Sequence, residues 1–357
     1  MNGDVLWSRA MRALAGISKH GTSVLAFGVV LGLLVPQLAN AAQPFMSVTV
    51  FVFVLGTLLR VDMRVFTATL RRPAVSVVMP TLVMVATPAA MAAAVHVLDV
   101  RPEIGLALVL AVSAPPSSGN AAVARMMGLD GAIPLAVTLL SMALTPITVP
   151  LLASVFGGMA ISPLALAFRL AILVGSAEGV ALLVRKRAGS ALTRHGPAVD
   201  GVIVVALLVF ALATMAGMRA RIAGHPALTI ECVAVAFACN TLLEITGFLL
   251  FPGSFSERVT IGVTLGNRNV GLIWAALGAA TPPVTALYFA CTQFPIYTLP
   301  RLIHILVRWR SSRMAATGSH ACCTEIPSDL LAEADLSEST QQDLGLNRPG
   351  FSGGSDM

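Results

Sequence analysis

Charged and aromatic residues are scarce in this sequence. Only 11% of its 357 residues are Asp, Glu, Lys or Arg and 6% are aromatic, whereas 56% are hydrophobic and the mean hydropathy is +0.85. Soluble globular domains carry roughly 25% charged residues. So few charges could not keep this much apolar surface in water, which argues against a soluble enzyme, a nucleic-acid-binding protein and a disordered scaffold. Because only helices and closed barrels span a bilayer, the long apolar runs predict an all-α integral membrane protein.

Ten of these apolar runs are long enough to be membrane-spanning helices. About 20 apolar residues cross a hydrocarbon core ~30 Å thick as a helix. The predicted spans are 22–41, 45–63, 74–98, 103–127, 132–157, 162–184, 199–218, 226–251, 259–281 and 283–307. Together they form a transmembrane domain over 22–308. Residues 1–21 form an N-terminal segment, and the polar residues 309–357 are expected to be a disordered tail.

Basic residues gather in alternate loops, and this sets the predicted orientation. Cytoplasmic loops are enriched in Lys and Arg, and with an even number of spans one side receives sixteen of them. These are Arg9, Arg12, Lys19, Arg60, Arg64, Arg71, Arg72, Arg125, Arg185, Lys186, Arg187, Arg194, Arg258, Arg308, Arg310 and Arg313, against Arg101, Arg219 and Arg221 on the other side. We therefore expect both termini to be cytoplasmic, in a membrane of the bacterial inner or plasma type.

Two spans contain residues that interrupt a helix. The fourth includes Ser113-Ala-Pro-Pro-Ser-Ser-Gly-Asn120, and the ninth includes Thr264-Leu-Gly-Asn-Arg-Asn-Val-Gly271. Proline removes a backbone donor, and glycine weakens a helix. Each interrupted span is the fourth of a set of five, so the second set would be an inverted copy of the first. Paired broken helices of this kind point to a transporter's binding site, although kinks that only pack helices are the alternative.

Four stretches within residues 25–310 share their order and separation with one family of transporters. They are Phe51–Arg60 with Arg71-Arg-Pro73; the stretch ending in Gly119-Asn120 with Gly128, Asp130 and Thr138; Pro146 with Pro150-Leu151-Leu152; and Asn240 with Gly266–Leu272. In these stretches the sequence resembles the bile acid:sodium symporter family.

The resemblance implies a core of helices 3–5 and 8–10 and a panel of helices 1, 2, 6 and 7. It implies that helices 4 and 9 cross, that substrate binds between core and panel, and that organic anions are carried with sodium. The matching candidates for substrate or ion binding are Pro115, Ser117, Ser118, Asn120, Thr138, Thr264, Asn267, Arg268 and Asn269.

The sequence departs from the family at the implied sodium sites. Thr264 and Arg268 stand where the resemblance places a Glu and a Gln, Val83 replaces a Gln and Pro134 a Ser. A residual site would hold only Asn120, Thr138 and Asn267. A guanidinium ~5 Å from a cation repels it by roughly 3 kcal/mol at an effective dielectric of ~20. We therefore expect sodium coupling to be altered or lost, and no other cofactor is implied.

Several roles remain open for the buried charges. Arg268 could replace the cation and hold the crossing carbonyls, could bind the substrate's acidic group, or could pair with Glu244 or Glu178. Glu178 could carry a proton, which would make coupling proton-driven, or could only pack helices.

The leading interpretation of the sequence is a secondary transporter of a small organic anion. An arsenite- or auxin-type efflux carrier of the same architecture is an alternative, although no Cys lies in the fourth-helix break. A receptor or an intramembrane enzyme is a further alternative from a different class. Against an enzyme, Ser117 and Ser118 have no His at a comparable depth, since His96 lies at a helix end.

Overall fold

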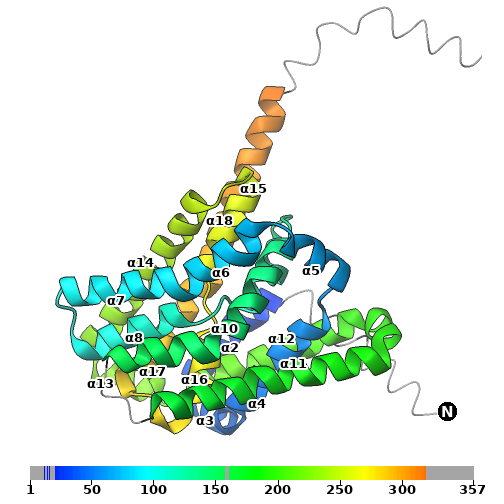
Figure 1. The fold of residues 1–357 in the computed structure, drawn as a ribbon. Coiled ribbons are helices and arrows are strands. Elements are labelled where there is room, and N and C mark those ends of the chain that lie inside the picture. Colours follow the sequence, from blue (N-terminus) through cyan, green and yellow to red (C-terminus); the bar gives the residue numbers. More distant parts are fainter. Residues whose placement is uncertain (1–11, 13, 15, 17–20, 157–160, 319–357) are drawn as a thin grey trace, which may run out of the picture. The chain divides into compact units, whose positions relative to one another are not determined.

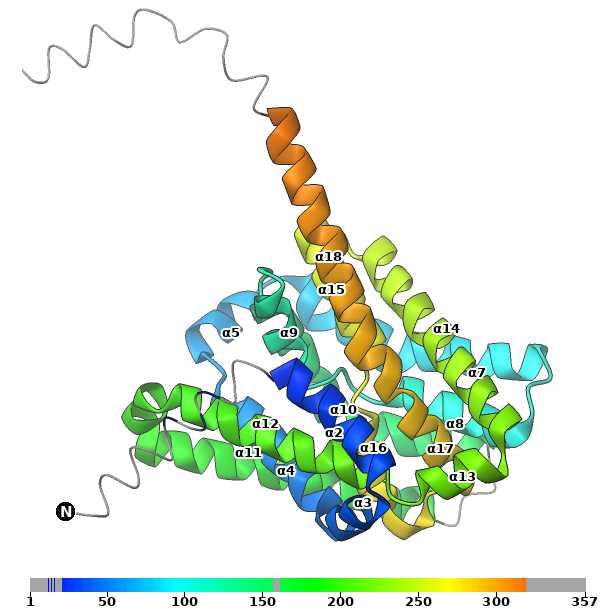
Figure 2. The same ribbon diagram turned by 180° about the vertical axis from the view of Figure 1, so that it is seen from behind.

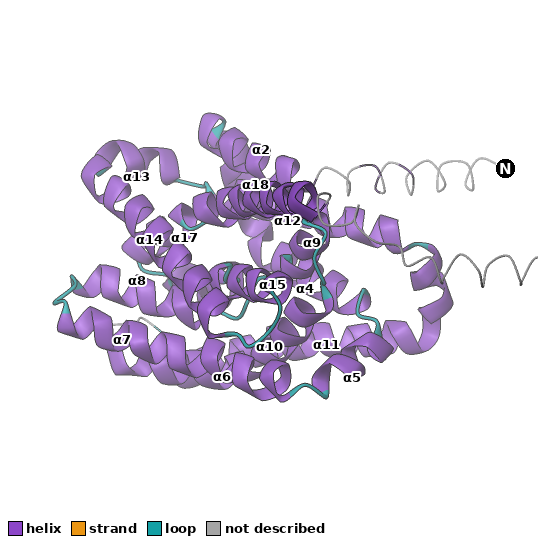
Figure 3. Cartoon of the chain, turned by 90° about the horizontal axis from the view of Figure 1, so that it is seen from above, coloured by secondary structure: helices purple, strands orange, loops and turns teal. Residues whose placement is uncertain are grey.

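The computed structural model describes residues 12, 14, 16, 21–156 and 161–318, and this part of the chain is helical, without strands (Figures 1 and 3). The α-helices are α2 (Gly21–Leu34), α3 (Pro36–Ala42), α4 (Met46–Leu59), α5 (Met63–Leu70), α6 (Met79–Thr81), α7 (Thr87–Val97), α8 (Pro102–Ser113), α9 (Asn120–Met126), α10 (Ala132–Phe156), α11 (Pro163–Arg194), α12 (Gly196–Thr214), α13 (Met218–Gly224), α14 (Pro226–Leu250), α15 (Phe255–Gly266), α16 (Val270–Leu277), α17 (Pro283–Cys291) and α18 (Gln293–Gly318). Short 3₁₀ segments, η1 (Gln43–Phe45) and η4 (Gly278–Ala280), and π-helical segments, η2 (Ala74–Val78) and η3 (Leu82–Ala86), join some of them.

Six helical segments of the described residues are long and apolar enough to cross a membrane. They are Pro36–Leu59, Ala74–Val97, Ala132–Ser154, Pro163–Gly189, Gly196–Gly224 and Pro226–Leu250, with the shorter apolar helices Pro102–Ser113 and Val270–Ala280 beside them. The chain is therefore an all-α protein with the helices of a multi-pass membrane protein.

The other four predicted spans are interrupted rather than continuous. The interruptions are at Val35, between Ser113 and Asn120, between Gly266 and Val270, and at Thr292. The second and third of these were expected, whereas those at Val35 and Thr292 were not. Each of the two missed interruptions precedes a proline, Pro36 or Pro295, whose ring supplies no backbone donor to the preceding turn.

One predicted connection is wrong. We expected a loop at 42–44 between the first two spans, but the structure is helical from Pro36 through η1 to Leu59. Pro44 lies in the first turn of η1, where its missing N–H has no helical partner to lose.

Two groups of helices pack closely within the described part of residues 1–304. In one, α12 contacts α2 and α4 (Figure 2), and Phe53 meets Phe210 edge to face with ring centroids 5.9 Å apart. In the other, α14 contacts α15, and α8 contacts α10 and α17. A Cβ at Gly262 would lie 2.6 Å from the Glu244 carbonyl oxygen, so glycine permits this close approach of α14 and α15.

The chain divides into two compact units after His304. Helix α18 continues to Gly318, past the predicted start of the tail at 309. Residues 309–318 contain Arg, Met and Ala, which favour helix, and no proline. Most of the predicted segment 1–21 and residues 319–357 lie outside the described residues. The site described below lies entirely within Met1–His304.

Candidate functional site

The two predicted helix breaks meet. Residues Pro116 and Arg268 form an isolated antiparallel bridge, in which the Ser117 N–H donates to the Asn267 carbonyl at 2.8 Å and the Asn269 N–H donates to the Pro115 carbonyl at 2.7 Å. Backbone groups inside a membrane must find partners within the protein or in water. Each break supplies these partners to the other. We call this arrangement, residues 114–120 with 264–270, the crossing.

Two asparagines cap the helix ends at the crossing. Asn120 donates through Nδ2 to the carbonyls of Asn267 (3.2 Å) and Thr264 (3.4 Å), which lie at the end of α15. The Oδ1 of Asn269 accepts from the Leu272 N–H at 3.2 Å and so caps the start of α16. Helix ends leave such groups without intrahelical partners, and a side-chain cap of this kind contributes about 1 kcal/mol.

Arg268 connects three chain segments from a buried position, with 4% of its surface exposed. Its Nη1 donates to the carbonyls of Val83 (3.1 Å) and Ala114 (3.2 Å), and its Nη2 donates to the Thr87 hydroxyl at 2.9 Å. Hydrogen bonds from a charged donor are roughly twice as strong as neutral ones. The guanidinium therefore fastens the helix at 82–97 and the end of α8 to the ninth-span break.

The Val83 carbonyl is available because of the helix register around it. In η3 the Thr87 N–H bonds to the Leu82 carbonyl, one residue earlier than in an α-helix. The next residue, Pro88, has no N–H to offer. The Val83 carbonyl thus receives the Thr87 hydroxyl (3.1 Å) and Arg268 instead. Both π segments end two residues before a proline, η2 before Pro80 and η3 before Pro88.

Of the three roles left open for Arg268, the ion pair with Glu244 or Glu178 is not formed among the described residues. Ion pairs in the part of the chain that the structure describes include Arg60–Asp200, Arg72–Glu257 and Arg101–Glu231, and none of these involves Arg268. Neutral oxygens accept hydrogen bonds from Nη1 and Nη2 of the guanidinium in place of a carboxylate. Glu244 lies against α15, since a Cβ on Gly266 would be 2.3 Å from its Cγ, and Glu178 lines a separate cavity.

Other predicted residues are placed as follows. The Thr264 hydroxyl donates to the Thr260 carbonyl of its own helix at 2.7 Å, so only its carbonyl takes part in the crossing. The Ser117 hydroxyl accepts from the Gly119 N–H at 3.3 Å. Thr138 is buried on α10, and Ser118 is buried in the fourth-span break.

Several buried polar atoms at and around the crossing have no hydrogen-bond partner among the described residues. They are Ser118 Oγ, Thr138 Oγ1, Ser141 Oγ, Asn240 Nδ2, Glu244 Oε1, Asn267 Oδ1, Arg268 Nε and Asn269 Nδ2. Buried polar atoms normally have a partner in protein, water or an ion, so this set can receive water, an ion or a substrate group. Sequence reasoning missed Ser141, although its spacing of three from Thr138 on a helix places both on one face.

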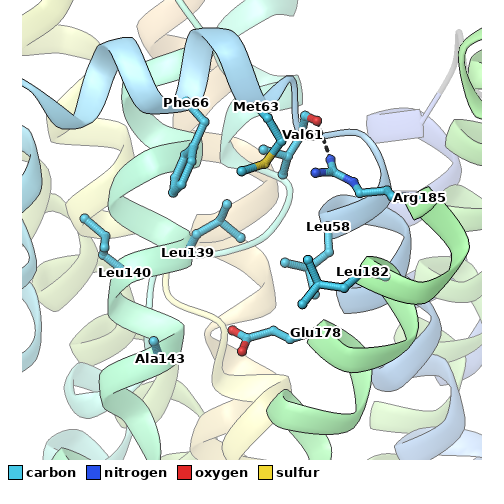
Figure 4. Close-up of a pocket in the computed structure, with 11 residues that line it drawn as sticks. Leu58, Val61, Met63, Phe66, Leu139, Leu140, Ala143, Glu178, Leu182 and Arg185 are labelled. Atoms are coloured by element: carbon cyan, nitrogen blue, oxygen red, sulfur yellow. Dashed lines mark hydrogen bonds between the residues drawn. The ribbon is translucent and has the colours of Figure 1, made fainter. Parts of the chain in front are cut away.

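A cavity of about 280 Å³ lies between α4, α5, α10 and α11 (Figure 4). Its lining is apolar except for two side chains from α11, Glu178 and Arg185. Arg185 donates to the Val61 carbonyl at the rim, whereas the Glu178 carboxylate points into the space toward Ala143. The other lining residues are Leu58, Val61, Met63, Phe66, Leu139, Leu140, Ala143, Ala181 and Leu182.

Comparison with known proteins does not identify a family for this chain. The chain matches no protein-family model, and a search of curated proteins returns no significant match.

Proposed function

We propose that the protein is a secondary transporter of a small organic anion that works without sodium. In this proposal the chain has ten spans in two inverted sets of five, and a core of spans 3–5 and 8–10 moves against a panel of spans 1, 2, 6 and 7. The observation that carries the proposal is the crossing, where two interrupted helices exchange backbone hydrogen bonds beside unpartnered polar atoms. Helix breaks that meet at membrane depth are typical of transporter binding sites.

The contacts of Arg268 support the loss of sodium. By the resemblance, positions 83, 264 and 268 would contribute to sodium sites. Here the guanidinium itself donates to the carbonyls of Val83 and Ala114. A cation ~5 Å away would be repelled by roughly 3 kcal/mol, about a hundredfold in affinity. Arg268 thus takes the structural place of the ion, and because Nη1 and Nη2 both have protein acceptors, this role is favoured over direct substrate binding.

The cavity supports a substrate path between core and panel. Helices α4 and α11 belong to the proposed panel and α10 to the proposed core, and all three line the cavity. An apolar cavity with few polar groups is typical of a small-molecule site. An organic anion would enter this cavity with its apolar part against the apolar lining.

Exchange measurements in proteoliposomes test the proposed function. The purified chain would be tested for exchange of labelled carboxylates, sulfonates, sulfate esters and arsenite, with sodium present or replaced by choline. We expect exchange of one organic anion class at the same rate in both media.

Two variants and two outcomes sharpen this test. Asn120→Ala should slow the exchange. Ser154→Ala should not, because the exposed Ser154 hydroxyl bonds only to its own helix. Exchange of none of these anions by the wild type would contradict the proposal, and exchange of arsenite alone would favour the efflux alternative.

A further inference from the structure

Glu178 is an isolated carboxylate in an apolar cavity. It lies in the middle of α11, and none of the described residues forms a hydrogen bond or ion pair with it. A carboxylate inside a membrane is costly to keep and marks a functional position by default. A packing role would bury it between helices, whereas Figure 4 shows it directed into the open space of the cavity.

The charged groups around Glu178 do not neutralise it. Arg185 lines the same cavity, two turns along α11, but its guanidinium donates to the Val61 carbonyl. Of the helices packed against α11, α4, α10 and α16 carry no titratable residue, and α12 carries Asp200, which pairs with Arg60 at 2.9 Å. From α5 the cavity receives Met63 and Phe66, and Asp62 caps that helix by accepting from the Arg64 N–H.

An ionised Glu178 would oppose the proposed substrate. Two like charges in a space of low dielectric repel each other strongly, and the donor group of the lining, the Arg185 guanidinium, bonds to the Val61 carbonyl. A protonated carboxyl group removes the repulsion and becomes a donor itself. The anion and the proton would therefore occupy the cavity together or not at all.

We propose that Glu178 is the proton-binding site that couples transport to the proton gradient, so that one proton crosses with each organic anion. The proposal rests on the proposed function. The carboxylate accepts a proton from the water on one side, the anion enters, and both leave on the other side after the cavity changes access. Glu178 lies on α11 and faces α10, so its charge acts where the proposed panel and core meet.

The test uses the full chain in proteoliposomes with a trapped pH-sensitive dye and naphthalene-2-sulfonate as the added anion. A sulfonate stays ionised, so it cannot carry the proton by itself. For the wild type we expect the interior to acidify when the sulfonate is added outside, without sodium. Exchange of labelled sulfonate should fall as pH rises, by up to about tenfold per pH unit once Glu178 ionises.

Three variants separate coupling from structure. Glu178→Gln should abolish acidification and make exchange independent of pH. Glu178→Asp should keep acidification and shift the pH at which exchange falls. Ser176→Ala, an exposed position on the same helix, should match the wild type. Acidification retained by Glu178→Gln, or acidification that requires sodium, would overturn the inference but leave the proposed function intact. If the wild type exchanges no anion at any pH, both fail.

Discussion

The charged residues of the crossing and of the cavity differ in their hydrogen-bond partners. At the crossing, Arg268 has three neutral oxygen acceptors and joins three segments of the chain. In the cavity, Glu178 has no partner among the described residues and faces open space. A charge that donates hydrogen bonds to three chain segments holds structure in place, whereas one without a partner can change its protonation at little structural cost. We therefore infer that Arg268 stabilises the crossing, and that Glu178 in the cavity couples the proposed transport to protons.

Removal of the Arg268 guanidinium should have the largest effect. Arg268→Gln leaves the carbonyls of Val83 and Ala114 and the Thr87 hydroxyl without their charged donor. Each buried group left unpaired costs about 1–3 kcal/mol, partly offset because a buried charge is removed. We expect the free energy of unfolding in mixed SDS micelles to fall by about 3 kcal/mol. Arg219→Gln is the control, because Arg219 is exposed, and equal stability of the two variants would refute the assignment.

A methyl group at Gly266 should have the next largest effect. The new Cβ would lie 2.3 Å from Glu244 Cγ and 3.0 Å from the Asn240 carbonyl, so α14 must move away from α15. Overpacking of this kind costs about 1–3 kcal/mol. The same unfolding measurement should show that loss for Gly266→Ala. Gly175→Ala, which meets no described atom within 4 Å, should be neutral or slightly stabilising.

Two buried polar side chains, Asn120 of the crossing and Ser141 of α10, should differ in their effect on stability. Asn120→Ala removes donors to the Asn267 and Thr264 carbonyls and should cost about 1–2 kcal/mol. Ser141→Ala removes a buried hydroxyl that has no partner among the described residues, and should leave unfolding unchanged or raise its midpoint. An equal loss of unfolding free energy in the two variants would show that their side-chain hydrogen bonds do not determine the effect.

The smallest expected effect is on the pH dependence of stability, outside the membrane-spanning part. The hydrogen bond from Arg72, followed by the Ser254 N–H, lowers the pKa of Glu257 below its ordinary value of 4.5. This stabilisation is complete above the ordinary pKa and is lost as pH falls through the lowered pKa of the folded state. Because Arg72 is 43% exposed, solvent screens the pair and we expect about 1 kcal/mol or less. Glu257→Gln should remove this part of the acid dependence in unfolding curves between pH 3 and 7.

Part of this arrangement was predictable from the residues. Pro115 and Pro116 predicted the fourth-span break, and the polar run at Asn267–Asn269 predicted the ninth. The contact between the breaks was implied by the resemblance to the bile acid:sodium symporter family. The interruptions before Pro36 and Pro295 were not predictable, because single prolines also lie within continuous helices, as Pro146 does in α10.

The partners of Arg268 were not predictable in the same way. The sequence left open whether Arg268 would hold carbonyls of the crossing, bind substrate or pair with one of two carboxylates. Its acceptors are two carbonyls and a hydroxyl, and the Val83 carbonyl is free only because a π-helical register coincides with Pro88. Such a register depends on tertiary packing rather than on local pattern. The cavity likewise depends on where α5 lies, which residue order alone does not indicate.

Sodium binding tests the central claim most directly. Binding of radioactive sodium to the purified chain, measured by scintillation proximity, requires no knowledge of the substrate. Arg268 in the place of the ion predicts no saturable binding by the wild type, and a gain of binding in the double variant Thr264→Glu/Arg268→Gln. Saturable sodium binding by the wild type that is abolished in Asn120→Ala would contradict the account.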